Sequence, residues 1–154
     1  MIWPNTTAVS MPRKPSKLPV VGNNPIGPKV AVYLGPPNVE HRHMAWRFSN
    51  ADIDGPFTCS QLDHEEHNCL WDRLRAFEKM NVAELRNDGS FHEIPIQKIS
   101  PMARRRLRDI GLDDQETLYS FRMMAACRLW CMKHENLFSI LWWDKHHQVY
   151  PTKK

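Results

Sequence analysis

The sequence predicts an α+β fold in which helices pack on one face of a mainly antiparallel sheet. Two observations predict this fold class. Residues 60–111 contain helix-capping residues and apolar residues at helical intervals, whereas from Thr117 onward the apolar residues recur with a period near two. The predicted order is a strand, a helix, an edge strand, a helix and three further strands, which is typical of a layered α+β domain.

The chain of 154 residues is long enough for one domain with a buried core, which we expect to span residues 41–154. Residues 1–40 contain eight of the twelve prolines and little periodicity, so burial cannot offset the entropy cost of ordering them. We therefore expect an extended Pro-rich arm that is largely disordered or docks on a partner. Its one candidate strand is Val30 to Leu34. The arm is basic, with Arg13, Lys14 and Lys17. Such an arm can contact nucleic acid; the alternative is a solvated tail.

The first half of the domain is expected to contain a strand and two helical segments. Met44 to Phe48 alternates apolar and polar residues, as a half-buried strand does. A helix over residues 61–79 follows, with Ser60 as its N-cap. Its apolar residues at helical intervals are Leu62, Leu70, Leu74 and Phe77. A second short helical turn is expected after Asn81, whose side chain can cap the turn while Glu84 reaches back.

The second half is expected to supply most of the sheet. Phe91 to Ile96 alternates, but Pro95 lacks an N–H donor, so we expect an edge strand. A helix should start at Ser100 and Pro101 and stop at Gly111. Three apolar runs then predict three strands, joined in part by the polar hairpin loop Lys133 to Asn136. The runs are Leu118 to Met124, Arg128 to Met132, and Leu137 to Trp143, of which the last is apolar on both faces and predicts a central strand.

Basic residues are distributed unevenly along the chain. Lys and Arg total 21 against 17 acids, for a net charge of +4. The predicted helix after Ser100 carries four arginines, and together with Lys98 they should form a cationic face. These arginines are Arg104, Arg105, Arg106 and Arg108. We expect this face to contact the phosphate backbone of a nucleic acid; the alternative is a solvated helix face.

The cysteines and histidines do not predict a metal site. The four cysteines follow no Cys-x2-Cys spacing, and residues 1–20 lack the apolar run of a signal peptide. We expect reduced, mostly buried thiols in a cytoplasmic protein with no membrane partner, because no window is apolar enough to span a bilayer. His64 and His67 lie three residues apart rather than four, so we expect no metal and no cofactor.

Two arginines lie on neighbouring predicted strands. Arg122 lies on the first of the three predicted carboxy-terminal strands, and Arg128 begins the next. Arginine is permanently charged and binds phosphate through a bidentate fork, so we predict that both bind the phosphate of an RNA. The alternative is that each pairs with an acid such as Asp144 or Glu116.

A histidine and a tyrosine follow the last predicted strand. RNA cleavage without a metal needs a proton acceptor, a proton donor and fixed positive charge. His147 can act as acid or base, and Tyr150 can donate a proton or stack on a base. Three residues apart beyond the strand, they can converge on one cleft. The alternative is a polar carboxy terminus that covers exposed sheet edges.

The carboxy-terminal third carries a family resemblance. Together with the order of elements, this part of the chain resembles the RelE/YoeB/HigB superfamily of small bacterial toxins. The resemblance lies in the stretch Cys127-Arg128-Leu129-Trp130, the apolar run to Trp143 and the ending with His146, His147 and Tyr150. Those toxins cleave mRNA on the ribosome, and their compact domain has a strand, two helices and three antiparallel strands. The ending from Asp144 to Pro151 is also similar to that of uncharacterised bacterial and phage proteins. The resemblance covers Met44 to Pro151.

The resemblance implies a function and a set of partners. It leads us to expect a toxin-like RNA-binding protein that acts as a ribosome-dependent, metal-free mRNA endonuclease, with RNA or the ribosome as its target and an antitoxin or host protein as a partner. One alternative is a non-enzymatic interaction module. Another is a phage or mobile-element regulator that binds nucleic acid or a host protein, with Val30 to Leu34 adding a strand to the sheet of another chain.

Overall fold

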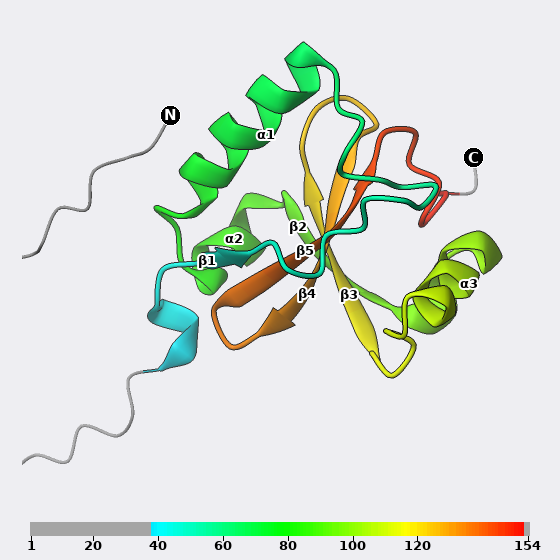
Figure 1. The fold of residues 1–154 in the computed structure, drawn as a ribbon. Helices are drawn as coiled ribbons and strands as arrows, with labels where there is room; N and C mark the ends of the chain where they lie inside the picture. Colours follow the sequence, from blue (N-terminus) through cyan, green and yellow to red (C-terminus); the bar gives the residue numbers. More distant parts are fainter. Residues whose placement is uncertain (1–37, 153–154) are drawn as a thin grey trace, which may run out of the picture. The chain divides into compact units, whose positions relative to one another are not determined.

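A computed structural model of the chain describes residues 38–152. The elements in chain order are η1 (Val39–His41), β1 (Ala45–Arg47), α1 (His64–Phe77), α2 (Val82–Asp88), β2 (Phe91–Pro95), η2 (Ile96–Lys98), α3 (Pro101–Asp109), β3 (Thr117–Arg122), β4 (Arg128–His134) and β5 (Leu137–Asp144) (Figure 1). Residues 1–37 of the predicted arm lie outside the described residues, including its candidate strand Val30 to Leu34. Only the last three residues of the predicted arm are described, and Glu40 in η1 forms an ion pair with Arg86 of α2.

The five strands form one mixed sheet in the order β1-β5-β4-β3-β2. β1 runs parallel to β5, and the other three neighbouring pairs are antiparallel, so the predicted α+β class and mainly antiparallel sheet are confirmed. β2 lies at an edge, as Pro95 requires. β5 is buried at every position after Leu137, as expected for a strand covered on both sides.

The helices cover both faces of the sheet, so the prediction that they pack on one face was wrong (Figure 1). α1 and α2 bury Leu74, Phe77, Val82 and Leu85 in a cluster on one face. α3 buries Ala103 and Leu107 in a second cluster that includes Trp130 and Trp142. Successive side chains of a strand point to opposite faces. Because β4 and β5 carry apolar side chains on both faces, one helical layer would leave the two tryptophans in water.

Capping residues determine where the helices begin. α2 has the expected capping box of Asn81 and Glu84. α3 has Ser100 at its N-cap and Pro101 at its first position, and Gly111 follows it at φ 69°.

The predicted cap of α1 was wrong, because Asp63 caps α1 in a reciprocal capping box with Glu66. The hydroxyl of Ser60 instead donates to the carbonyl of Ile53 at 2.8 Å.

Candidate functional site

β2, β3 and β4 bring four polar side chains onto the sheet face that α3 also covers. Arg122 lies directly opposite Arg128 across β3 and β4. One row along, Ser120 lies opposite Trp130 on one side and His92 of β2 on the other. Cross-strand neighbours have Cβ atoms roughly 5 Å apart, so these residues form a compact group at the end of the sheet.

A pocket of about 270 Å³ opens over this group. It contains all four residues predicted from the sequence to be catalytic, namely Arg122, Arg128, His147 and Tyr150. The rest of its lining is His92, Ile94, Ser120, Trp130 and Thr152. The structure therefore brings the four residues together; their catalytic roles stay predictions.

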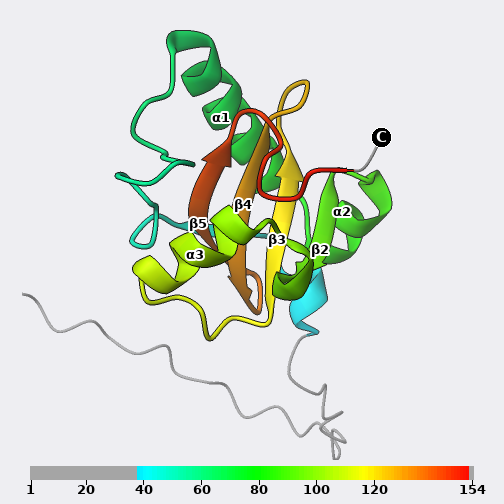
Figure 2. The ribbon, with the colours of Figure 1, turned by 90° about the vertical axis from the view of Figure 1, so that its right-hand side faces the viewer.

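The segment after β5 folds back across the ends of β4 and β3 (Figure 2). Two of its side chains, His147 and Tyr150, line the pocket. The carboxylate of Asp144, which is 1% exposed, holds this segment. It accepts the backbone N–H groups of Gln148 at 2.8 Å and Val149 at 2.9 Å, and the indole N–H of Trp130 at 3.3 Å. The buried side chain of Val149 and its carbonyl, which accepts the Ser100 N–H at 2.7 Å, fix the segment against the start of α3.

The pocket is electropositive. Within residues 38–152, no carboxylate lines it, and neither Arg122 nor Arg128 forms an ion pair with an acid, Asp144 and Glu116 included. The Nη1 of Arg128 donates to the carbonyls of Ala125 at 3.1 Å and Cys127 at 2.9 Å, which leaves the rest of its guanidinium available.

Burial and neighbouring charge act on two titratable groups of the pocket. Burial and the nearby Arg122 lower the pKa of Arg128 from its ordinary value, although an arginine remains charged near neutral pH. Burial and the charge of Arg128 also lower the pKa of His147. A neutral imidazole beside two guanidinium groups can accept a proton from a group that approaches with an anion.

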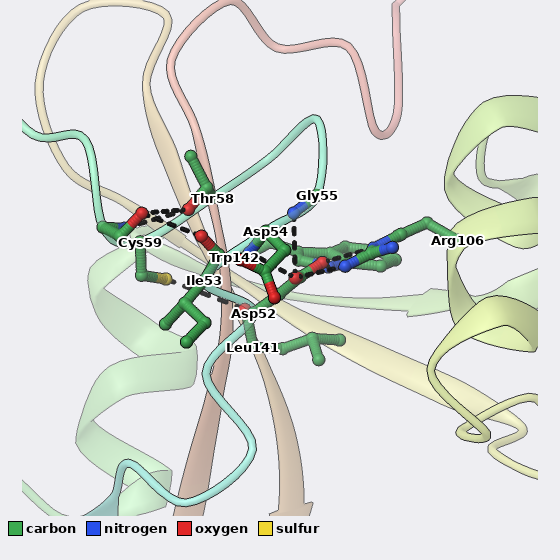
Figure 3. Close-up of polar contacts among 10 residues, drawn as sticks. Asp52, Ile53, Asp54, Gly55, Thr58, Cys59, Arg106, Leu141 and Trp142 are labelled. Carbon is green, nitrogen blue, oxygen red and sulfur yellow. Dashed lines mark hydrogen bonds and ion pairs between the residues drawn. The ribbon is translucent and has the colours of Figure 1, made fainter.

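The predicted cationic face of α3 loses one of its members. Arg104, Arg105 and Arg108 are exposed, and so is Lys98 in η2. Arg106 instead turns toward the loop after β1 and forms an ion pair with Asp52, with Nε–Oδ2 and Nη2–Oδ1 distances of 2.7 Å (Figure 3). Arg106 is therefore removed from the predicted nucleic-acid-binding set.

Asp52 is the centre of a buried polar network (Figure 3). Its side chain is 2% exposed, and it also accepts the indole N–H of Trp142 at 3.1 Å and the backbone N–H of Gly55 at 3.0 Å. The hydrogen bonds from Arg106 are the main cause of lowering the pKa of Asp52 to about 2. A Cβ at Gly55 would overlap both Asp52 and Arg106, so only glycine fits there. This network ties the loop after β1 to α3 and β5.

His92 and Ser120 are pocket residues that the sequence interpretation missed. The alternation of Phe91 to Ile96 placed His92 and Ile94 on one face of an edge strand, which was the one available signal. Which face that would be depends on the register of β2 against β3, and no local pattern determines this register.

The cysteines offer no reactive thiol or metal site in the described part of the chain. All four cysteines are free; Cys127 and Cys131 are buried, whereas Cys59 and Cys69 are half-buried. Burial raises the pKa of Cys59 and of Cys127 to about 12. Within residues 38–152, no three His, Cys, Asp or Glu side chains gather closely enough to hold a metal ion. No helix in this range has the length and apolar character needed to cross a membrane.

The description of the pocket rests on its geometry and charge and not on similarity to known proteins. Comparison of the chain with known protein families, with curated proteins and with solved structures gave no significant match.

Proposed function

We propose that this protein binds RNA at the pocket between β2, β3, β4 and the carboxy-terminal segment, and cleaves a phosphodiester bond there without a metal. The resemblance to the RelE/YoeB/HigB toxins implies the same activity, with mRNA on the ribosome as the substrate. One observation supports the proposal most directly. Arg122, Arg128, His147 and Tyr150 line one pocket, and no carboxylate of residues 38–152 lines it.

Each group has a role that its chemistry supports. The two guanidinium groups bind the phosphate and stabilise the negative charge that develops as the bond breaks. His147, whose pKa is lowered, accepts a proton from the attacking hydroxyl. Tyr150 stacks on a base or donates a hydrogen bond. Asp144 is a positioning residue, because it holds the segment that carries both side chains.

The size of the pocket favours a single strand. At about 270 Å³ it lies near the lower end of ligand pockets, roughly 300 Å³, and suits one nucleotide rather than a duplex. The start of α3 touches the carboxy-terminal segment through Ser100 and Val149. The exposed arginines of α3 therefore lie on the same side of the sheet as the pocket and extend its positive charge toward the neighbouring phosphates. These arginines are Arg104, Arg105 and Arg108.

Binding without cleavage is the second candidate function. The same exposed arginines favour it, because a helix face can bind a nucleic-acid backbone without any catalytic group.

Induced expression, combined with mapping of new RNA 5′ ends, tests the proposal. The unmodified protein should arrest growth and create new ends in translated mRNA. Arg128→Ala and His147→Ala should each relieve the arrest and remove the ends, whereas His134→Ala, at the exposed far end of β4, should do neither. Growth arrest that is indifferent to His147→Ala and leaves RNA intact would favour the binding function instead. The same comparison should be repeated with purified full-length protein and labelled mRNA, with and without ribosomes.

A further inference from the structure

We infer that His92 is a second catalytic residue of this pocket and acts as the general acid that protonates the leaving 5′ oxygen. The inference rests on the proposed RNA cleavage and adds to it a residue that neither the sequence interpretation nor the resemblance identified. His92 lies on β2, the edge strand, and is exposed where it lines the pocket.

Each of the two histidines is a neighbour of a different arginine of the pair. His92 lies opposite Ser120, which is two residues before Arg122 on β3, so His92 and Arg122 are diagonal neighbours. His147 lies on the segment that follows β5 and folds back across the ends of β4 and β3 (Figure 2). The arginine whose charge acts on His147 is Arg128, so His92 is a neighbour of Arg122 and His147 is a neighbour of Arg128.

Phosphoryl transfer requires this arrangement of acid and base. The attacking and leaving oxygens lie in line on opposite sides of the phosphorus, so a group that serves one oxygen cannot also serve the other in the same step. A phosphate held between Arg122 and Arg128 would have one imidazole near each of them. Two imidazoles flanking an anion site can therefore perform both proton transfers.

The step balances without any further reactant. The 2′-OH gives its proton to the imidazole of His147, and the 2′ oxygen forms a bond to phosphorus. The bond between phosphorus and the 5′ oxygen breaks, and His92 delivers its proton to that oxygen. The products are a 2′,3′-cyclic phosphate and a 5′-OH, and proton exchange with water restores both histidines.

Other titratable or charged groups of the pocket are alternatives for the acid. Those that line it with His92 are Arg122, Arg128, His147 and Tyr150. Arginine holds its proton too tightly to donate it near neutral pH, and His147 serves the opposite oxygen. Among the described residues that line the pocket, Tyr150 is therefore the titratable group that could replace His92, and the experiment includes it.

A substrate with sulfur in place of the bridging 5′ oxygen at the cleaved bond tests the assignment. The thiolate leaves without a proton, so it needs no general acid. On ordinary RNA, His92→Ala should slow single-turnover cleavage by roughly 10²–10⁴-fold. On the sulfur substrate, the cleavage rate of His92→Ala should be within about tenfold of the rate of the unmodified protein. His147→Ala should cleave both substrates slowly.

Two controls make the outcomes distinct. RNA affinity should change by less than about threefold in His92→Ala, and His134→Ala should leave both cleavage rates unchanged. Cleavage that His92→Ala does not slow, or slows equally on both substrates, would overturn the role of His92 and leave the proposed function standing. If the sulfur substrate restores the cleavage rate of Tyr150→Phe and not that of His92→Ala, then Tyr150 is the general acid. If the unmodified protein cleaves neither substrate with or without ribosomes, the proposed function fails and this inference fails with it.

Discussion

Arg122 and Arg128 lie directly opposite each other on adjacent antiparallel strands, and neither forms an ion pair with an acid in the described part of the chain. Like charges in directly opposed positions destabilise a sheet. The mutual influence is visible in Arg128, because Arg122 contributes to lowering its pKa. An arrangement that opposes folding but concentrates positive charge in a pocket is typical of an anion-binding site.

Arg122→Gln should therefore stabilise the free protein and weaken RNA binding. We expect the free energy of unfolding to rise by roughly 0.2–1 kcal/mol as the repulsion is removed. The slope of log Kd against log salt concentration should decrease by about 0.7 for one lost contact with single-stranded RNA. Urea unfolding and fluorescence anisotropy measure the two effects. Arg75→Gln, on α1 at the opposite sheet face, is the matched control, with a stability change within about 0.5 kcal/mol. A loss of stability in Arg122→Gln would contradict the repulsion.

Arg128→Gln should raise the pKa of His147. Burial is the larger cause of the lowered pKa and persists in the variant, so the pKa should rise but stay below the ordinary value of 6.5. NMR titration of the imidazole Hε1 signal measures it. Because the folded-state pKa is lowered, the unfolded chain takes up the proton first as the pH falls. The contribution of His147 to stability is thus present above about pH 6.5 and is lost on acidification. An unchanged His147 pKa in the variant would show that the two side chains do not interact.

Asp144→Ala should free the carboxy-terminal segment from the sheet. The change removes the acceptor of two backbone N–H groups and of the buried indole N–H of Trp130, so we expect a loss of roughly 3 kcal/mol of stability. Hydrogen exchange should accelerate at the N–H groups of Gln148 and Val149 more than in the centre of β4. Gln148→Ala removes only an exposed side chain and should leave this exchange unchanged. Uniform acceleration throughout the sheet would mean that Asp144 supports the whole fold rather than this segment.

Arg106→Ala should destabilise the domain, because it leaves the buried carboxylate of Asp52 without its charged partner. We expect a loss of roughly 2–3 kcal/mol, since the N–H groups of Trp142, Asp54 and Gly55 still bind Asp52. Arg105→Ala, exposed on the same helix, should change stability by less than about 0.5 kcal/mol. Denaturant unfolding of the two variants tests the comparison, and equal stability would remove the structural role of the ion pair.

The same pair should govern stability in acid. The pKa of Asp52 falls from 3.8 to about 2 on folding, so its contribution is present above about pH 4 and is lost as the pH falls toward 2. The shift corresponds to about 2 kcal/mol. In Arg106→Ala this part of the pH dependence should shrink, because the hydrogen bonds from Arg106 are its main cause.

The features that could be predicted from the sequence are those that depend on residues close together in the chain. The capping box of Asn81 and Glu84, the start of α3 at Ser100 and its end near Gly111 were predicted because each depends on contacts within a few residues. Arg122 and Arg128 belong to one short hairpin, so alternation alone placed them on adjacent strands. Asp63, by contrast, caps α1 in place of Ser60, because two capping residues three positions apart present nearly the same local pattern.

Tertiary structure decided the rest through contacts between distant residues. Arg106 belongs to the basic run in sequence, but its partner Asp52 lies 54 positions away, and only the folded chain removes it from the cationic face. His92 reaches the pocket through the register of β2 against β3, and α3 occupies its own face because β4 and β5 bury both sides. The sequence by itself thus determined the elements and their charges, since propensity, capping and periodicity are local. Which side chains share a pocket depended on register and layer packing, which arise only when distant segments exclude water together.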